Sequence, residues 1–372
     1  MNCAQISYEI VSPESHVYRL SLSKNYVSDW TVNNAIRELL QNALDSDSPF
    51  DVQFSPDLSD MSKRVMSIRS ANTSLHPSKL ILGCTGKAED ADAIGGFGEG
   101  FKLALLVLLR NNLGVVIENG GYYWEPSFEI DPSFGIETLH ITETRNPGNC
   151  DLVFHVSGLT KEDVEEIEAS CLHLQDPPEN IIETFMGDIL VDIPGKLYVN
   201  GLFVCDTQLA HSYNMHPRYI SLGRDRATVS DFDLLWQTKD MWFASGKWDY
   251  IAEQMDARIK DFDYCNYSTP ALVKEACYKV YKERYDGKIL ATSQMELESF
   301  VKAGMREVIV VPETFASVVR DHDDYGHAVR VITKTPTDYL QDWLRENKQH
   351  LRKDGKLKFK TLLDMSQKWC IV

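Results

Sequence analysis

The sequence has no apolar run long enough to cross a membrane. Its longest run, Leu103 to Leu109, is far shorter than the roughly 20 residues that a membrane-spanning helix needs. The N-terminal segment also lacks a basic stretch followed by an apolar one, which is the pattern of a secretory signal. We therefore expect a cytoplasmic protein that is not targeted elsewhere and has no membrane partner.

The sequence also lacks closely spaced cysteine pairs, and it has fewer basic than acidic residues. The eight cysteines include no Cys-x-x-Cys, which excludes the usual zinc clamps and redox pairs and favours reduced, mostly buried thiols. Against 55 Asp and Glu there are 38 Lys and Arg, a net charge of -17. Phosphate backbones are bound by clustered cations, so nonspecific nucleic-acid binding is not expected over most of the surface. The stretch from Lys348 to Lys360 leaves room for a local basic patch.

What the chain does have is the composition of an ordinary globular protein. Its 372 residues, 43% hydrophobic and 25% charged, suggest two or three domains. Loop-like breaks occur at Asp176 to Asn180 and at Asp261 to Thr269. We predict a mixed α/β (α+β) chain with three regions, residues 1–165, 166–284 and 285–372.

The first region has the pattern of an α/β sandwich. Its predicted elements are a helix over 32–44, a strand over 64–69, a glycine loop with a buried helix over 95–110, and a strand over 152–156. In the middle region, apolar residues flank Asn200-Gly201, which predicts a hairpin turn. The last region has the pattern of a small α/β unit.

The predicted helix over 32–44 places three polar side chains on one face. At ~100° per residue, Glu38, Asn42 and Asp45 fall within roughly 60° of one another, opposite the apolar side chains. A carboxylate and an amide on one face can hold a divalent ion and polarise water for attack on a phosphoryl group. The alternative is a solvated helix face.

A glycine-rich loop then leads directly into the apolar helix. It runs from Ile94 to Lys102 and contains Gly96, Gly98 and Gly100. Glycines let a backbone approach phosphates, and a helix N-terminus presents unpaired N–H groups to an anion. The loop lacks a preceding strand, the dinucleotide-binding spacing and the Gly-Lys-Ser/Thr ending of a P-loop. A phosphate site of another kind is the natural inference.

Together these motifs resemble those of the GHKL ATPases, the superfamily of gyrase, heat-shock chaperone, histidine kinase and mismatch-repair ATPases. Glu38-x-x-x-Asn42-x-x-Asp45 is similar to the family's N-box, and Gly95 to Lys102 is similar to its second glycine box. Between them, Leu82 to Lys87 resembles the family's Leu-Gly-x-Ser/Thr-x-Lys stretch. The resemblance covers about residues 30 to 110 and fades by 165. It implies a Bergerat-type sandwich followed by a transducer-like domain.

The resemblance also implies roles for individual residues. Glu38 would be the general base, Asn42 would bind Mg²⁺ between the phosphates of ATP, and Asp45 would support the site. The remaining nucleotide-contacting positions implied in the two loops are Thr85, Lys87, Gly96, Gly98, Gly100 and Lys102. Lys87 would neutralise phosphate charge, whereas Lys102 either does the same or points at solvent.

One position departs from the family pattern. Where the family has Asp-x-Gly-x-Gly after a strand, this chain has Ser70-Ala71-Asn72-Thr73-Ser74. The family's Asp accepts a hydrogen bond from the adenine amino group, and a Ser accepts it more weakly, by roughly 1 kcal/mol. A water, or Asn72 and Thr73, would have to supply the missing acceptor, or the pocket takes another nucleotide.

Two cations downstream are candidates for the γ-phosphate. In related two-domain ATPases a Lys or Arg of the transducer domain stabilises charge during phosphoryl transfer. Arg224 and Arg226 lie in the corresponding region. A surface ion-pair cluster is the alternative.

Two functions follow. The first is a Mg²⁺-dependent ATPase whose closure changes a homodimer or protein-partner contact. The second is a catalytically weak nucleotide sensor, or an acidic interaction protein that acts by binding a partner. A histidine kinase is disfavoured, because no phosphoacceptor helix precedes the domain.

Overall fold

The structure is a computed structural model. It describes residues 15–46, 48–81, 99–133, 135–222, 229–325, 336–347, 350–351, 355–356 and 358–362. The chain divides into two compact units. The first unit comprises Met1–Ile182, Met186–Thr207 and His211–Val229, and the second comprises Glu183–Phe185, Gln208–Ala210 and Ser230–Val372. The predicted boundary between residues 284 and 285 falls at the last residue of helix α6 (Ala271–Tyr285).

The first unit is built on a seven-stranded sheet in the order β1-β6-β5-β4-β7-β3-β2, with antiparallel pairing throughout. The strands are β1 (His16–Ser23), β2 (Phe50–Pro56), β3 (Arg64–Ser70), β4 (Gly114–Asn119), β5 (Tyr122–Ile130), β6 (Glu137–Arg145) and β7 (Leu152–Leu159). In β3, Met66, Ile68 and Ser70 are buried on one face while the residues between them are less buried. This alternation defines the face of β3 that joins the core.

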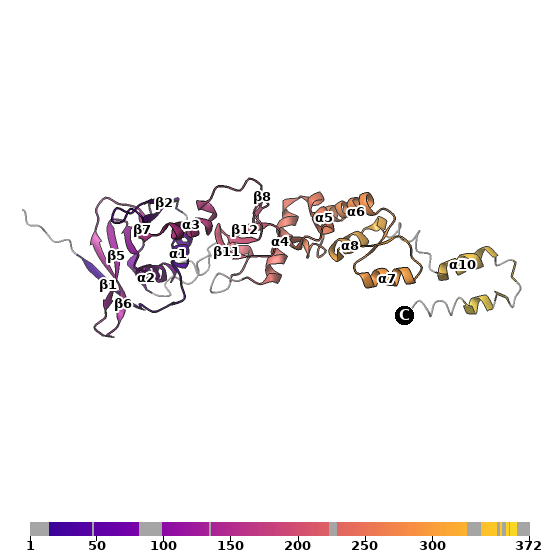
Figure 1. The fold of residues 1–372 in the computed structure, drawn as a ribbon, viewed down its shortest axis with the longest axis horizontal. Helices are drawn as coiled ribbons and strands as arrows, with labels where there is room; N and C mark the ends of the chain where they lie inside the picture. Colours follow the sequence, from indigo (N-terminus) through magenta and orange to yellow (C-terminus); the bar gives the residue numbers. More distant parts are fainter. Residues whose placement is uncertain are drawn as a thin grey trace, which may run out of the picture. The chain divides into compact units, whose positions relative to one another are not determined.

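Helices α1 (Val32–Leu44) and α2 (Gly100–Arg110) pack on each other and on that core (Figure 1). Thr31 starts α1 with a capping box, since its side chain accepts from the Asn34 N–H and the Asn34 side chain accepts from the Thr31 N–H. The helix has the bounds that periodicity predicts. Residues 101–108 of α2 are all buried, and all of them except Lys102 are apolar.

The rest of the first unit contains helix α3 (Lys161–Ala169) and most of a five-stranded sheet. The sheet order is β11-β10-β12-β9-β8. Its strands are β8 (Ile181–Thr184), β9 (Gly187–Leu190), β10 (Lys196–Val199), β11 (Leu202–Asp206) and β12 (Ser212–Met215). β10 and β11 form the predicted hairpin, and Asn200 and Gly201 both take positive φ, at 48° and 79°, as the turn demands. Short 3₁₀ turns cover Pro77–Leu80, Leu172–Leu174 and Pro217–Tyr219.

The second unit is mainly helical. Its helices are α4 (Asp231–Ser245), α5 (Trp248–Asp256), α6, α7 (Gln294–Lys302), α8 (Glu313–Arg320) and α10 (Pro336–Asn347), with a 3₁₀ turn at Lys260–Phe262. Strands β13 (Ile289–Ala291) and β14 (Val308–Val310) pair in parallel, and α7 connects them. The predicted mixed α/β class is therefore confirmed. None of the helices in the described part of the chain combines the length and apolarity needed to cross a bilayer.

Candidate functional site

Glu38 and Asn42 lie on α1 as predicted, Asp45 ends the helix, and Glu38 is buried. Glu38 is only 6% exposed, although it is a carboxylate on a helix. The solvated-face alternative is therefore wrong for this residue, because carboxylates are almost never buried without a specific reason. Asn42 lies one turn later and is half-buried, and Asp45 forms the C-terminal cap of the helix.

Asn42 makes one side-chain hydrogen bond, to the backbone of its own helix. Its Nδ2 donates to the Glu38 carbonyl at 2.8 Å, so the nitrogen end of the amide is fixed against the backbone. The structure gives Oδ1 no partner among the described residues. An amide oxygen in this state is a suitable ligand for a hard cation such as Mg²⁺. No cluster of three or more His, Cys, Asp or Glu side chains gathers elsewhere in the described residues to hold a metal.

The start of α2 lies directly against Glu38. A Cβ placed on Gly100 would overlap the carboxylate oxygen Oε2 of Glu38, so only glycine fits here. Glu99 precedes the helix without a capping hydrogen bond from its side chain. The Glu99 side chain therefore does not cap the first N–H groups of α2, and the Glu38 carboxylate lies beside the start of this helix.

The loop after β3 forms the third wall. Ser70 is 5% exposed and shares the buried face of β3 with Met66 and Ile68. The Ala71 N–H donates to the Pro49 carbonyl at 3.0 Å, and Thr73 Oγ1 donates to Ser48 Oγ at 2.7 Å. These two bonds place the loop beside Ser48 and Pro49, in the segment that follows α1.

Asn72 sits in a tight turn of this loop. It takes a positive φ of 51°, at the position that aligns with a glycine of the motif that the loop resembles. Asn is among the few residues that tolerate this conformation. Asn72 is therefore compatible with the turn.

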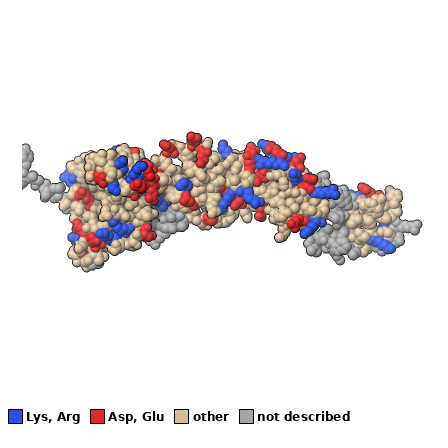
Figure 2. All heavy atoms as spheres, viewed as in Figure 1, with Lys and Arg blue, Asp and Glu red and all other residues tan. Residues whose placement is uncertain are grey.

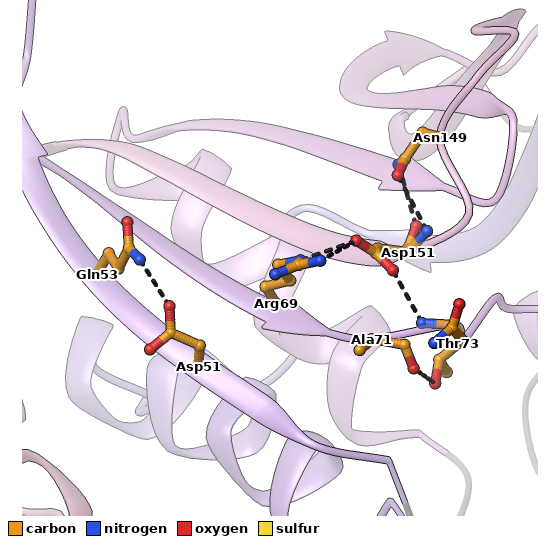
Figure 3. Close-up of polar contacts among 8 residues, drawn as sticks. Asp51, Gln53, Arg69, Ala71, Thr73, Asn149 and Asp151 are labelled. Atoms are coloured by element: carbon orange, nitrogen blue, oxygen red, sulfur yellow. Dashed lines mark hydrogen bonds and ion pairs between the residues drawn. The ribbon is translucent and has the colours of Figure 1, made fainter.

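A carboxylate that sequence reasoning missed holds this loop in place. Asp151, just before β7, accepts from the Asn72 N–H at 2.8 Å through Oδ1 and from Arg69 Nε at 2.8 Å through Oδ2 (Figure 3). The Asn72 N–H and the Arg69 guanidinium hold the pKa of the Asp151 carboxyl below its ordinary value. No local pattern signals this role, because Asp151 is 79 residues from Asn72.

A second missed residue holds the end of the same loop. Asn119, at the end of β4, is 4% exposed. Its Oδ1 accepts from the Leu75 N–H at 2.6 Å, and its Nδ2 donates to the Leu75 carbonyl at 2.9 Å. Asp151 and Asn119 thus fix the loop at both ends.

Lys102 does not point at solvent. It is fully buried, and its ammonium group donates to the carbonyls of Lys79 at 2.8 Å and Ile81 at 2.7 Å. The solvent-facing alternative is wrong. The ammonium joins α2 to the Pro77–Leu80 turn and to Ile81 directly after it, and its contact with phosphate stays a prediction.

Several predicted site residues lie outside the described residues. They are Thr85, Lys87, Gly96, Gly98, Arg224 and Arg226. Their roles remain predictions from the resemblance. The structure brings together Glu38, Asn42 and Gly100, and it places the Ser70–Thr73 loop beside the segment that follows α1.

A hollow of about 430 Å³ adjoins the start of α2 without including the predicted residues. It is lined by Ser21, Leu22, Ser23, Tyr26, Glu99, Ile136 and Thr138. Its walls come from β1, β6 and the residue before Gly100. The sequence gives no signal for it, because its lining comes from segments distant in the chain.

Comparison with known proteins leaves the family open. No protein-family model matches the chain. The chain is similar to an uncharacterized protein of Mycoplasma pneumoniae, with 26% identity over 223 residues that cover 56% of this chain and 89% of that protein.

Proposed function

We propose that the first unit binds Mg²⁺-ATP between α1, the loop after β3 and the start of α2, and hydrolyses it to ADP and phosphate as a divergent GHKL-type ATPase. The observation that carries the proposal is the buried Glu38 carboxylate set against Gly100, one turn from the Asn42 amide oxygen. A general base, a metal ligand and a helix N-terminus meet there. Phosphoryl transfer to water uses these three groups.

Each group has a defined part in the proposed reaction. The N–H groups at the start of α2 bind phosphate oxygens. Asn42 Oδ1 is the protein ligand of Mg²⁺, which when bound supplies charge neutralisation at the phosphates. Glu38 accepts the proton of the attacking water and orients it towards the γ-phosphate. Arg224 and Arg226 remain candidates for the cation that stabilises the transferred group.

The biological output would be a changed contact with a protein partner or a second copy of the chain, as in two-domain relatives. The alternative, an acidic protein that acts by interaction alone, has less support. On the face drawn in Figure 2, acidic and basic side chains of the described residues are interspersed. A buried carboxylate beside a glycine is also unnecessary for a pure interaction protein.

Calorimetric titration of Mg²⁺-ATP tests the proposal. Wild-type protein should bind, and Asn42→Ala should weaken binding at least about tenfold, because the metal ligand is lost. Asn111→Ala is the matched control, since Asn111 Nδ2 makes the same bond to the Val107 carbonyl at 2.8 Å at the far end of α2. Equal affinities in all three proteins, or no binding in any of them, would contradict the proposed nucleotide site.

A further inference from the structure

Four aromatic side chains meet near the start of α4, in the second unit. Phe232 and Trp236 lie one turn apart on the helix, with ring centroids 5.8 Å apart and planes at 27°. Tyr264 and Tyr267 follow the Lys260–Phe262 turn, and their ring centroids lie 6.2 and 6.0 Å from that of Trp236. We call Phe232, Trp236, Tyr264 and Tyr267 the aromatic cluster.

Part of the aromatic cluster is open to solvent. Phe232 is 55% exposed and Tyr267 is 51% exposed. By contrast, Trp242, further along α4, is fully buried and packs on Phe262 with ring centroids 4.9 Å apart. The same helix therefore contributes one tryptophan to the core and a phenylalanine to the surface. A contiguous exposed group of aromatic rings is a feature of interaction surfaces.

Acidic residues border the aromatic cluster. Asp231 and Asp233 are exposed on both sides of the phenylalanine in the chain, and Asp263 is exposed directly before the first tyrosine. The charges of Lys260 and Arg258 stabilise the carboxylate of Asp263 in part. Asp231 and Asp233 have no ion-pair partner within the part of the chain that the structure describes. The border of the cluster therefore carries negative charge that is not neutralised.

One ring of the cluster already binds a cation. Lys239 Nζ lies 3.6 Å from the centroid of the Trp236 ring and 3.1 Å from Asp240 Oδ1. An aromatic face attracts a cation, and a carboxylate beside it adds an ion pair. Inside the protein, these two kinds of group thus hold one ammonium together. The exposed phenylalanine and the aspartates beside it offer the same two kinds of group at the surface.

This combination selects one kind of occupant. A guanidinium stacks flat on aromatic rings and binds carboxylates through two parallel N–H bonds, so it uses both kinds of group at once. The bases of a nucleic acid would also stack on the rings, but the carboxylates would repel its phosphates. A proline-rich segment would use the rings and leave the carboxylates without a partner.

We propose that the aromatic cluster and its aspartates bind an arginine-containing segment of a protein partner. The guanidinium groups stack on Phe232 and Tyr267 and pair with Asp231 and Asp233. This surface belongs to the second unit, and its binding of arginine does not depend on nucleotide binding by the first unit.

Titration of the full chain with labelled peptides tests the proposal, with fluorescence anisotropy as the readout. The probes are three peptides of equal length, in which glycine alternates with arginine, lysine or proline, and a labelled single-stranded DNA. The arginine peptide should bind about three- to tenfold more tightly than the lysine peptide, because the two carry the same charge and the guanidinium stacks better. The proline peptide and the DNA should bind more weakly than both.

The ratio of the two cationic peptides separates this surface from general attraction by an acidic protein. The net charge of -17 would by itself attract arginine and lysine peptides equally. Equal affinities for the two peptides therefore overturn the proposal. Tighter binding of the proline peptide or of the DNA overturns it as well.

Variants locate the binding on the aromatic cluster. Phe232→Ala should remove the preference for arginine over lysine, because the exposed ring is lost and the net charge stays the same. Trp343→Ala is the matched control, since Trp343 is an exposed aromatic residue of α10 that stacks on Phe359 at 5.0 Å. It should leave the preference unchanged. A preference that survives in a folded Phe232→Ala protein overturns the proposal.

The contribution of the carboxylates has its own variant. Asp231→Asn/Asp233→Asn should weaken binding of both cationic peptides by about two- to fivefold, because two ion pairs are lost. Unchanged affinities in this variant would contradict the pairing with these aspartates. If a variant does not fold, the ratios measured with wild-type protein still decide.

Discussion

The two ends of the candidate site are built differently. At the proposed phosphate end, Glu38 and Asn42 belong to one helix, and Glu38 lies against Gly100 of the next helix. At the proposed base end, Asp151 and Asn119 hold a loop by accepting hydrogen bonds from its backbone N–H groups. The first end resembles the GHKL motif in sequence, and the second departs from it.

The difference shows which constraints the two ends carry. A general base and a metal ligand must keep their chemical type, because no neighbouring group can replace them. A base pocket mainly needs a defined shape. Hydrogen bonds from residues of other strands can maintain that shape. Asn72 takes a positive φ, which glycine also adopts, while Ser70 offers a hydroxyl where the motif that the loop resembles has a carboxylate.

The largest effect should come from the phosphate end. We expect Glu38→Gln to lower phosphate release at saturating Mg²⁺-ATP by about 100-fold or more, because the general base is lost. Nucleotide affinity should change little, since the amide keeps the size of the carboxylate. Glu162→Gln, on the exposed surface of α3, is the control. Unchanged turnover in Glu38→Gln would assign the base to another residue.

A smaller effect should appear in stability at the same end. We expect Gly100→Ala to lower the free energy of unfolding by about 1–3 kcal/mol, because the new methyl group meets the Glu38 carboxylate. In Glu38→Ala/Gly100→Ala the carboxylate is gone, so most of that loss should be recovered. Urea unfolding of both single variants and the double variant measures the coupling.

If the two substitutions change the free energy of unfolding additively, Gly100 and Glu38 do not lie in contact. Gly355→Ala is the control, because its nearest atom, Leu351 Cδ2, would lie at an ordinary contact distance of 3.7 Å. It should leave stability unchanged.

The smallest effect belongs to the base end and depends on pH. The pKa of Asp151 lies below its ordinary value of 3.8, so its carboxylate stabilises the fold above that pH. This contribution is lost as pH falls through the lowered pKa. Asp151→Asn lacks it at every pH. The stability difference between wild type and Asp151→Asn should therefore shrink on acidification below about pH 4.

Nucleotide affinity distinguishes the role of Asp151 in holding the loop from a nonspecific effect of low pH on stability. Asp60 in the β2–β3 turn also has a lowered pKa, chiefly because it accepts from the Ser62 hydroxyl. Asp60→Asn should change acid stability in the same direction and leave nucleotide affinity unchanged. Asp151→Asn should weaken affinity a few-fold at neutral pH. Equal affinities in the two variants would contradict a role for Asp151 in shaping the site.

Local patterns gave the parts of the fold that depend on neighbouring residues. The bounds of α1, the Asn200-Gly201 turn and the buried character of α2 follow from periodicity, capping and turn chemistry within a few residues. The grouping of Glu38 with Asn42 follows from the same periodicity.

Long-range contacts could not be read from the sequence in this way. The Asp151 bond to Asn72, the Asn119 bonds to Leu75 and the burial of Lys102 against Ile81 each join residues at least 21 positions apart. They depend on which strands become neighbours. Polar residues of ordinary type at strand ends carry no periodic signal of such a role.

Amide hydrogen exchange with and without Mg²⁺-ATP tests the central claim most directly. We expect slower exchange in three segments, residues 32–46, 70–75 and 100–110, because they form the proposed nucleotide site in the first unit. Exchange in α6 and α8 of the second unit should change less. Nucleotide binding that leaves those three segments unchanged, or that protects only the second unit, would contradict it.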